Sequence, residues 1–428
     1  MLSSMKITCA YGDKGKEIDF PGSLDITCIE PQYTESVPNP KGLIAESLNS
    51  PIGSPPLQTL VKTGDSVAIV INDITRATPY PIMLPVLIEY LVECGVKTQD
   101  ITIFNATGTH RANTADELDV MLSPGVAQSI RIVQNDAMDR GSHRHVGTTQ
   151  SGNEVYIHEE FLGCDVKILT GFIEPHFFAG FSGGGKAVMP GLAALSSVMY
   201  NHNPRFLDDP NATWGICRGN PLWEDLRAGA VMVNPTFLVN VALNRDKEIT
   251  AVFAGDLDKA HGEGREYVRS RAMRRVDSPF DIVITTNSGY PLDLNLYQAV
   301  KGMSAAARIT KPGGDIILLS ECRDGVPAHG MYGKLMQEAD SVDDMLKTVR
   351  APGYHEQDMW QVFIHAKILK QATVHIYTDG LNKAEIESAK LVHCSDVLET
   401  LGQLVARRGD GVKICVLPEG PQTIPYLG

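Results

Sequence analysis

A glycine-rich stretch, EPHFFAGFSGGGKAVMPG at residues 174–191, holds the residues whose types and spacing could do chemistry. Gly180, Gly185 and Lys186 have the spacing of a phosphate-binding P-loop, GxxxxGK. A P-loop continues with Ser or Thr, whose hydroxyl binds magnesium, whereas here Ala187 follows. Two roles therefore stay open for the lysine. It can act as a positive charge beside phosphate oxygens, or as a neutral amine that bonds covalently to a ligand approached closely by the glycine backbone.

Several polar residues, all but one of them outside this stretch, follow apolar segments that are predicted strands. They are Asp73, Arg76, His110 and His176. In open α/β sheets, ligands bind outside the carboxyl ends of the strands, so we expect these residues to converge on one crevice. With a second domain opposite, that crevice becomes a cleft between domains.

Each of these residues also has a structural explanation when it is taken alone. Asp73 in NDITRATP can accept backbone N–H bonds in a turn, His110 in GTHR can be solvated, and His202 in NHNPR can bind the last carbonyls of a helix. Three histidines with Asp, Arg and Lys on the loops of one sheet favour a shared site. The histidines lack a short-spaced metal signature such as HExxH. Two histidines on opposite sides of a substrate carbon can exchange proton-donor and proton-acceptor roles, as a racemase requires.

The elements that must position these residues alternate between apolar strands and helices from residue 65 onward. SVAIVIND and DITIFNATGTHR each begin with a predicted strand and lead into a helical stretch. The first helical stretch, IMLPVLIEYLVECGV, ends at Gly95, and the second, NTADELDVML, has Asn113 or Thr114 as its cap. This alternation predicts an α/β fold with mostly parallel sheets flanked by helices.

A charged helical stretch without a strand pattern, GDLDKAHGEGREYVRSRAMRRVDSP, separates two predicted domains. We expect an N-terminal α/β domain at residues 1–270, which carries the lysine and the histidines, and a C-terminal α/β domain at residues 271–428. The second domain opens with FDIVITTNSGYPLDLNLYQAVKG, read as strand, loop and helix. We expect the active site in the cleft between the domains, and we allow the last residues to pack back on the first domain.

The composition argues against several classes of protein. A chain of 428 residues that is 43% hydrophobic is long enough for two domains with cores of their own. A net charge of −13 argues against a nucleic-acid partner. No apolar run approaches the roughly 20 residues that cross a bilayer, so we expect a soluble, cytoplasmic protein with no membrane partner. The eight cysteines never form a CxxC pair, and we expect reduced, mostly buried thiols.

The chain resembles the nickel-pincer lactate racemases and their 2-hydroxyacid racemase and epimerase relatives. The motifs that carry the resemblance are, in order, NDITRATP, GTHR, EPHFFAGFSGGGKAVMPG, NHNPR, YQAVKG and Trp360. They span nearly the whole chain, and an ordered set is more specific than any single motif. The resemblance implies an isomerase that acts on a small 2-hydroxyacid, with lactate as the first expectation.

The resemblance also implies a cofactor and a set of roles. The cofactor is the nickel-pincer nucleotide, a pyridinium-3-thioamide-5-thiocarboxylic acid mononucleotide with nickel, bonded covalently to Lys186 in the loop with Gly184 and Gly185. By the same resemblance, His202 is the metal ligand, and soft sulfur with one imidazole suits nickel. The implied acid/base pair is His110 and His176, acting while the Cα hydrogen moves reversibly to the cofactor as hydride. Enzymes that build the cofactor are implied partners.

Further residues match the family's substrate and cofactor contacts. Arg76 and Lys301 correspond to cationic groups near the substrate carboxylate and the cofactor, and a guanidinium suits a carboxylate or phosphate. Asp73 is expected to orient Arg76 or a histidine. The remaining expected contacts are Gln298, Tyr297 and Trp360, and core packing is the competing interpretation for Tyr297 and Trp360.

Two alternatives to a lactate racemase stay open at this point. The first is a racemase or epimerase of another 2-hydroxyacid, such as malate or a longer aliphatic, aromatic or sugar acid. The second is a non-catalytic phosphate- or nucleotide-binding protein, in which the glycine loop would hold an anion without a covalent bond. This second alternative leaves the three histidines unexplained.

Overall fold

The computed structural model describes residues 4–32, 34–328 and 330–428. The chain forms two compact units. Unit 1 comprises Met1–Gln32, Asn203–Arg205 and Arg271–Gly428, and unit 2 comprises Tyr33–His202 and Phe206–Ser270. The domain division predicted from the sequence stays a prediction, and these units group the N-terminal segment differently, with the C-terminal part of the chain.

Unit 2 is built on a six-stranded sheet in the order β13-β12-β9-β4-β5-β6. All neighbours pair in parallel except β12 and β13, which are antiparallel. The strands are β4 (Val67–Asn72), β5 (Ile101–Ala106), β6 (Arg131–Gln134), β9 (Val166–Phe172), β12 (Phe237–Leu243) and β13 (Ile249–Gly255). Because the chain runs outward from β4 to β6 and then returns to β9 on the other side of β4, the strand order reverses between β4 and β9. In doubly wound sheets, ligands bind at this switch point.

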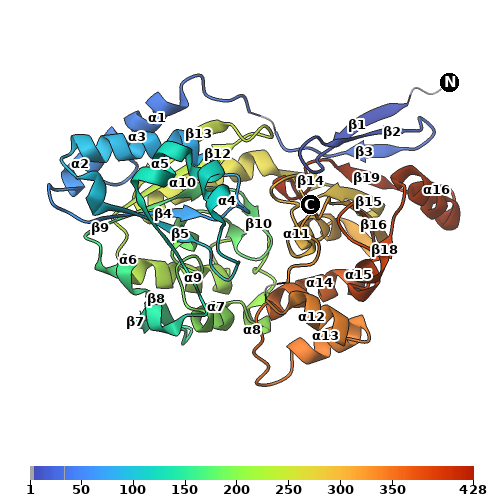
Figure 1. Ribbon diagram of the computed structural model, residues 1–428. Coiled ribbons are helices and arrows are strands. Elements are labelled where there is room, and N and C mark those ends of the chain that lie inside the picture. Colours follow the sequence, from blue (N-terminus) through green and yellow to red (C-terminus); the bar gives the residue numbers. More distant parts are fainter. Residues whose placement is uncertain (1–3, 33, 329) are drawn as a thin grey trace. The chain divides into compact units, whose positions relative to one another are not determined.

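Helices cover both faces of this sheet. Figure 1 shows α1 (Pro40–Asn49) and α3 (Tyr80–Glu93) on one side, and α6 (Glu159–Gly163) and α9 (Pro221–Met232) on the other. The apolar side chains of α1 and α3 pack on alternate residues of the strands, as the two-residue period of a strand requires. The sheet is therefore buried on both faces, which explains its near-continuous apolar strands. Further elements of this unit include α2 (Leu57–Leu60), α4 (Ala115–Leu122), α5 (Pro124–Ser129), α7 (Leu195–Asn201), α10 (Leu257–Ala272) and the hairpins of β7 (His143–Thr148) with β8 (Glu154–His158) and of β10 (Pro175–His176) with β11 (Gly180–Phe181).

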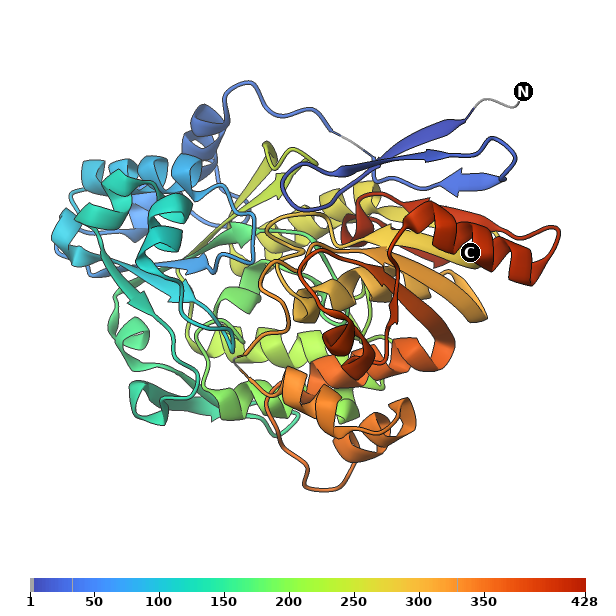
Figure 2. The same ribbon diagram turned by 45° about the vertical axis from the view of Figure 1, so that its right-hand side comes forward.

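Unit 1 has an all-parallel six-stranded sheet in the order β18-β17-β16-β15-β19-β3. Its strands are β3 (Ile26–Cys28), β15 (Phe280–Thr286), β16 (Thr310–Leu319), β17 (Ala372–Tyr377), β18 (Val392–His393) and β19 (Ile414–Leu417). Figure 2 shows α16 (Val397–Arg408, red) on one face and α14 (Met359–Gln371, orange) on the other. The hairpin of β1 (Met5–Cys9) and β2 (Lys16–Phe20) packs its apolar side chains with those of α16.

The α/β fold and most of the sequence-based elements are confirmed. The predicted helices are α3 and α4, and Thr114 caps α4 in a capping box with Glu117. The charged stretch contains the helix α10, but MRRV within it forms a strand that was not expected, β14 (Met273–Val276). This strand pairs with β20 (Ile424–Leu427), so the last strand of the chain is paired within unit 1. Packing of the last residues on the first domain stays a prediction.

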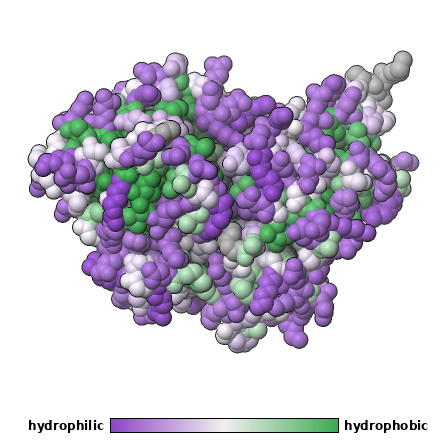
Figure 3. Space-filling model, viewed as in Figure 1, coloured by the Kyte–Doolittle hydropathy of each residue, from purple (hydrophilic) through white to green (hydrophobic). Residues whose placement is uncertain are grey.

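The thiols and the surface agree with the sequence analysis. All eight cysteines are free, and five of them are buried. Figure 3 shows a mostly polar surface, with apolar side chains gathered in one region of the visible face of unit 2, over its sheet. Within the described ranges, no helix is both long and apolar enough to cross a membrane.

Candidate functional site

His110 and Asp73 form a tight pair at the carboxyl ends of neighbouring strands. Asp73 follows β4 and His110 follows β5, and the distance from His110 Nδ1 to Asp73 Oδ2 is 2.5 Å. Thr75 Oγ1 donates to the other carboxylate oxygen at 2.7 Å. Burial alone would raise the pKa of Asp73, but His110, Arg76 and Thr75 together lower it to about 2. The carboxylate is therefore ionised at neutral pH and fixes the proton of the ring on Nδ1.

Arg76 links this pair to the loop that follows β9. Its Nη1 lies 3.8 Å from Oε1 of Glu174, and both side chains are largely buried. The same Nη1 has no hydrogen-bond partner within the described chain. A buried guanidinium at ion-pair distance, but not at hydrogen-bond distance, retains the capacity to bind a ligand carboxylate or phosphate.

The ring of Phe178 lies at the centre of a second group of residues. The centroid of His176 is 4.5 Å from it and that of His202 is 5.0 Å from it, both nearly perpendicular. Lys186 Nζ lies 5.8 Å from the same ring. The backbone N–H of Ala179 donates to His176 Nδ1 at 3.2 Å, so the neutral ring carries its proton on Nε2. The loop thus brings the lysine and two of the histidines around one aromatic side chain.

At neutral pH, His202 is neutral and a substantial fraction of Lys186 is the neutral amine. Burial and the positive charge of Arg76 lower the pKa of the Lys186 ammonium to about 7. Burial, followed by the charge of Lys186, lowers the pKa of His202 well below its usual value. His202 is the residue at which α7 ends. Binding of the last helix carbonyls by its side chain, the structural interpretation, stays a prediction. An amine whose pKa is about 7 is partly unprotonated at neutral pH and can be acylated. A neutral imidazole can bind a metal.

The glycines of the loop make room for protein atoms of this unit. Gly184 has φ +56, and a Cβ there would lie 2.5 Å from Nδ1 of the buried His261. A Cβ on Gly185 would lie 2.8 Å from the Cβ of Ala230. Asn240 Oδ1 accepts the Gly184 N–H at 2.8 Å. In a P-loop, backbone N–H groups of the loop bind phosphate. Here the Gly184 N–H is already bonded to Asn240. Direct contact of Gly184 and Gly185 with a cofactor stays a prediction.

The predicted residues of unit 1 form a cluster of their own. Lys301 Nζ donates to Gln298 Oε1 at 2.6 Å, and both side chains are buried in α11 (Leu296–Ala307). Trp360, near the start of α14, donates from Nε1 to the hydroxyl of Tyr297 at 2.8 Å. Trp360 is 2% exposed, so it is packed inside the protein, and its role as a wall of the site stays a prediction. The position of the site between domains stays a prediction.

Sequence reasoning missed two residues of the site. Glu174 stands in the quoted motif, but it received no role, although an acidic residue just past a predicted strand is the same signal that identified Asp73. Phe178 gave no usable signal, because an aromatic residue in a loop is ordinarily read as core. Its ring nevertheless joins His176, His202 and Lys186.

The fold and these clusters define a protein with two α/β units, in which the switch point of a doubly wound sheet carries a hydrogen-bonded Asp–His pair, a buried arginine and a buried lysine whose pKa is about 7. Its family follows from comparison with known proteins. The chain belongs to the lactate racemase family: residues 11–215 match the lactate racemase N-terminal domain and residues 276–424 match the lactate racemase C-terminal domain. It is therefore an isomerase of the racemase type.

Similar proteins cover almost the entire chain. A lactate racemase of Thermoanaerobacterium thermosaccharolyticum is 34% identical over 384 residues, 89% of each chain. One of Lactiplantibacillus plantarum is 35% identical over 379 residues, 88% of this chain and 89% of that protein. The solved lactate racemase apoprotein of the first organism superposes with a TM-score of 0.90 at 33% identity, covering 98% of this chain and all of that one. A Thermotoga maritima protein with a TM-score of 0.72 and 19% identity, covering 92% of this chain and all of that one, shares the fold.

Proposed function

We propose that this chain racemises lactate, with the residues at the switch point of unit 2 as its reaction centre. The observation that carries the proposal is the Asp73–His110 pair beside the loop of His176 and Lys186, in a chain of the lactate racemase family. The two relatives above are lactate racemases by name, at 34% and 35% identity. We extend their substrate to this chain.

The two histidines present complementary edges for proton transfer. Asp73 holds the proton of His110 on Nδ1, which makes Nε2 the proton acceptor, and the carboxylate stabilises the imidazolium that forms. The neutral ring of His176 presents an N–H at Nε2, because its Nδ1 accepts a backbone N–H. In the proposed reaction, one ring removes the proton of the substrate hydroxyl and the other donates a proton as the product hydroxyl forms. Arg76 is proposed to bind the substrate carboxylate.

The residues also fit the nickel-pincer nucleotide that the family resemblance implies. Lys186 has the near-neutral amine that a covalent attachment needs, and His202 has the neutral imidazole that a metal needs. Within the described residues, no group of three or more His, Cys, Asp or Glu could hold a metal, so ligands beyond the protein side chains are required at His202. When bound, the cofactor would supply sulfur and carbon ligands to nickel and a reversible acceptor for the Cα hydrogen.

The proposal also assigns roles to four residues of unit 1, to Glu174 and to the enzymes that build the cofactor. Lys301 and Gln298, joined by their hydrogen bond, are proposed to contact the substrate, and Tyr297 and Trp360 to bound the site. Glu174 is proposed to orient Arg76. Because the cofactor must be built and attached before the protein can act, the cofactor-maturation enzymes are proposed partners.

The test is chiral chromatography of cofactor-matured protein incubated with single enantiomers of lactate. Conversion of both enantiomers, abolished in Lys186→Ala, supports the proposal. Malate, 2-hydroxybutyrate, phenyllactate and gluconate serve as parallel substrates. If the protein converts one of these acids and not lactate, the proposed substrate changes to that acid and the proposed residue roles stay the same. Full activity of Lys186→Ala would refute the role of the lysine.

The non-catalytic phosphate-binding alternative receives little support at the glycine loop. The Gly184 N–H is taken by Asn240, and the loop packs on His261 and Ala230. Residues Gly184–Ala187 of the loop form a short 3₁₀ helix of about one turn, which is too short to present the N-terminus of a regular α-helix to a phosphate. A mass increase on Lys186 after maturation in cells, measured by peptide mass spectrometry, would argue further against this alternative.

A further inference from the structure

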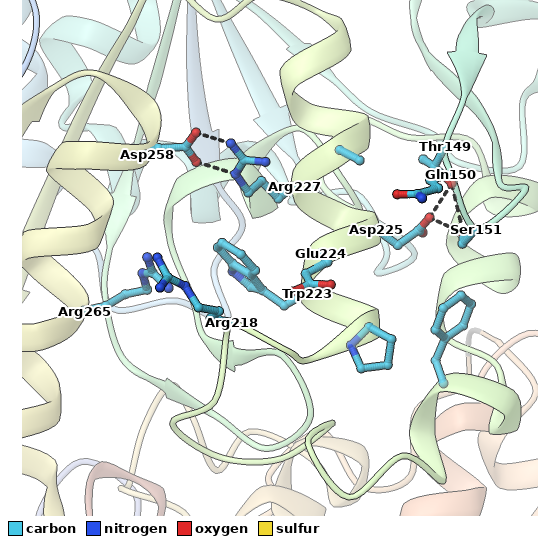
Figure 4. Close-up of a pocket in the computed structure, with 13 residues that line it drawn as sticks. Thr149, Gln150, Ser151, Arg218, Trp223, Glu224, Asp225, Arg227, Asp258 and Arg265 are labelled. Carbon is cyan, nitrogen blue, oxygen red and sulfur yellow. Dashed lines mark hydrogen bonds and ion pairs between the residues drawn. The ribbon is translucent and has the colours of Figure 1, made fainter.

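A pocket of about 750 Å³ opens in unit 2 next to the start of α9 (Figure 4). Its walls come from the turn between β7 and β8, from α9 and from α10. A volume of this size is in the range of sites for small organic ligands. None of the residues assigned to the racemase reaction lines it, so this pocket calls for an explanation of its own.

The carboxylates around the pocket are already bonded within the protein. Asp225 Oδ1 accepts hydrogen bonds from Thr149 Oγ1 at 2.5 Å and from Ser151 Oγ at 2.6 Å. Asp258 forms a two-point ion pair with Arg227, as the dashed lines in Figure 4 mark. Asp258 is therefore paired with a cation, whereas Asp225 keeps its negative charge and is held by neutral donors.

Two arginines of the pocket stay without a carboxylate partner. Neither Arg218 nor Arg265 makes an ion pair with any residue that the structure describes, and the Arg218 side chain is exposed. Arg265 Nε is buried and has no hydrogen-bond partner in the described chain. The Arg265 guanidinium lies 4.8 Å from the ring centre of Trp223. Figure 4 shows Arg218 and Arg265 to one side of Trp223, and Asp225 and Glu224 to the other.

We propose that this pocket binds an organic phosphate of nucleotide size, without a covalent bond. Arg218 and Arg265 would hold the phosphate. Two guanidinium groups carry two positive charges, which match a doubly charged phosphate better than they match a ligand with one carboxylate. The Trp223 indole offers a surface for a planar ring. Gln150 and Glu224, which also line the pocket, carry oxygens that can accept hydrogen bonds from sugar hydroxyls.

The pocket shares a wall with the lysine loop. Trp223, Arg227 and Asp258 line the pocket and also a small space beside Gly185 and Lys186. A ligand in the pocket would therefore contact Trp223, Arg227 or Asp258, and these same side chains border the space next to the lysine loop. The proposal concerns non-covalent binding and does not depend on the racemase reaction, so the two can fail separately.

Isothermal titration calorimetry with AMP on the full-length apoprotein tests the proposal. We expect AMP to bind the wild-type chain, and Arg218→Gln and Arg265→Gln each to weaken the affinity about 10-fold or more, as the loss of a charged hydrogen bond predicts. Arg245→Gln is the matched control, because Arg245 is a half-exposed arginine of the same unit that does not line the pocket, and its affinity should equal that of wild type. Inorganic phosphate should bind more weakly than AMP, and lactate should not compete.

Two results would overturn the proposal, and two more would overturn its assignment of the nucleotide ring to Trp223. Equal affinity of wild type and Arg218→Gln would remove the phosphate site, and this exposed position stays testable even if Arg265→Gln fails to fold. Loss of AMP binding in Lys186→Ala would assign the ligand to the lysine's own site. Inorganic phosphate binding as tightly as AMP, or Trp223→Leu binding AMP like wild type, would remove the role of the indole wall.

Discussion

Replacement of Asp73 by Asn tests whether the Asp73–His110 pair takes part in the reaction. The carboxylate can only accept the Nδ1 proton of His110, which leaves Nε2 as the proton acceptor. An amide of the same shape can donate to Nδ1 instead and so move the ring proton to Nε2. Both histidines would then present an N–H to the substrate, and no base would remain. We expect Asp73→Asn to lower kcat on the order of 10²- to 10⁴-fold.

The Asp73–His110 pair contributes too little to the free energy of folding for its loss to unfold the protein, so a fall in kcat can be told apart from unfolding. The pKa of Asp73 falls from 3.8 to about 2, which corresponds to about 2 kcal/mol in favour of the folded state with an ionised carboxyl. Because the folded-state pKa is the lower one, this contribution is present above pH 4 or so and is lost as the pH falls through about 2. A loss of about 2 kcal/mol leaves most of the roughly 5–15 kcal/mol of a typical domain. The variant should therefore stay folded at neutral pH.

The assay is the initial rate of racemisation from each lactate enantiomer, with urea unfolding measured on the same preparations. Since the two enantiomers have equal free energies in water, kcat/KM must fall by the same factor in both directions. Asp315→Asn is the matched control: Asp315 is also a buried aspartate bonded to a histidine, with Oδ1 3.0 Å from His375 Nε2, but it lies in unit 1 and has no assigned role in the reaction. It should lose stability and keep kcat.

A wild-type kcat in folded, fully matured Asp73→Asn would refute the assignment of His110 as a base held by Asp73. So would an equal fall of kcat in Asp315→Asn, because the effect would then be one of general stability. Supplementing the assay with imidazole gives a further check on His110→Ala, which should recover part of its rate if the lost group is a base.

Three further outcomes are expected. His202→Ala should lose nickel from matured protein while the far-ultraviolet circular dichroism is kept, and full metal content by atomic absorption would contradict its role as a ligand. Gly184→Ala should destabilise unit 2 by about 1–3 kcal/mol in urea unfolding, because the new Cβ would meet His261 at a φ of +56; an unchanged midpoint would count against the packing described for the loop. For Asp315, burial opposes ionisation, but His375 and Arg408 lower the pKa below its usual value, so its stabilisation is present above the unfolded pKa and lost as acid is added. Asp315→Asn should therefore flatten the acid limb of a stability profile, and an unchanged limb would refute this coupling.

Local signals in the sequence were sufficient for the elements of unit 2 that carry the site. The apolar run of β4 and the capping pattern at Thr114 are short-range features, and they identified their elements. The position of Asp73 and His110 at strand ends predicted that they would converge, and they meet at 2.5 Å. This agreement is physical, because parallel neighbouring strands bring their carboxyl ends to one edge.

Features that depend on distant pairing could not be predicted from local patterns. β3 has three residues with almost no buried face, and it becomes a strand only because β19, near the other end of the chain, pairs with it. β14 is a charged MRRV segment that is held by β20. The central place of Phe178 among the histidines depends on the path of the loop, which no periodicity encodes.

The pairing of β3 with β19 also has a consequence for the order in which a ribosome can complete the two units. Unit 2 lies between these strands in the chain, so all of its residues emerge while β3 still waits for its neighbour. At typical elongation rates that interval is on the order of tens of seconds. The nascent chain can therefore finish the unit that carries Lys186 first, with an unmatched N-terminal segment attached. Unit 1 can close its sheet only after β19 has been translated.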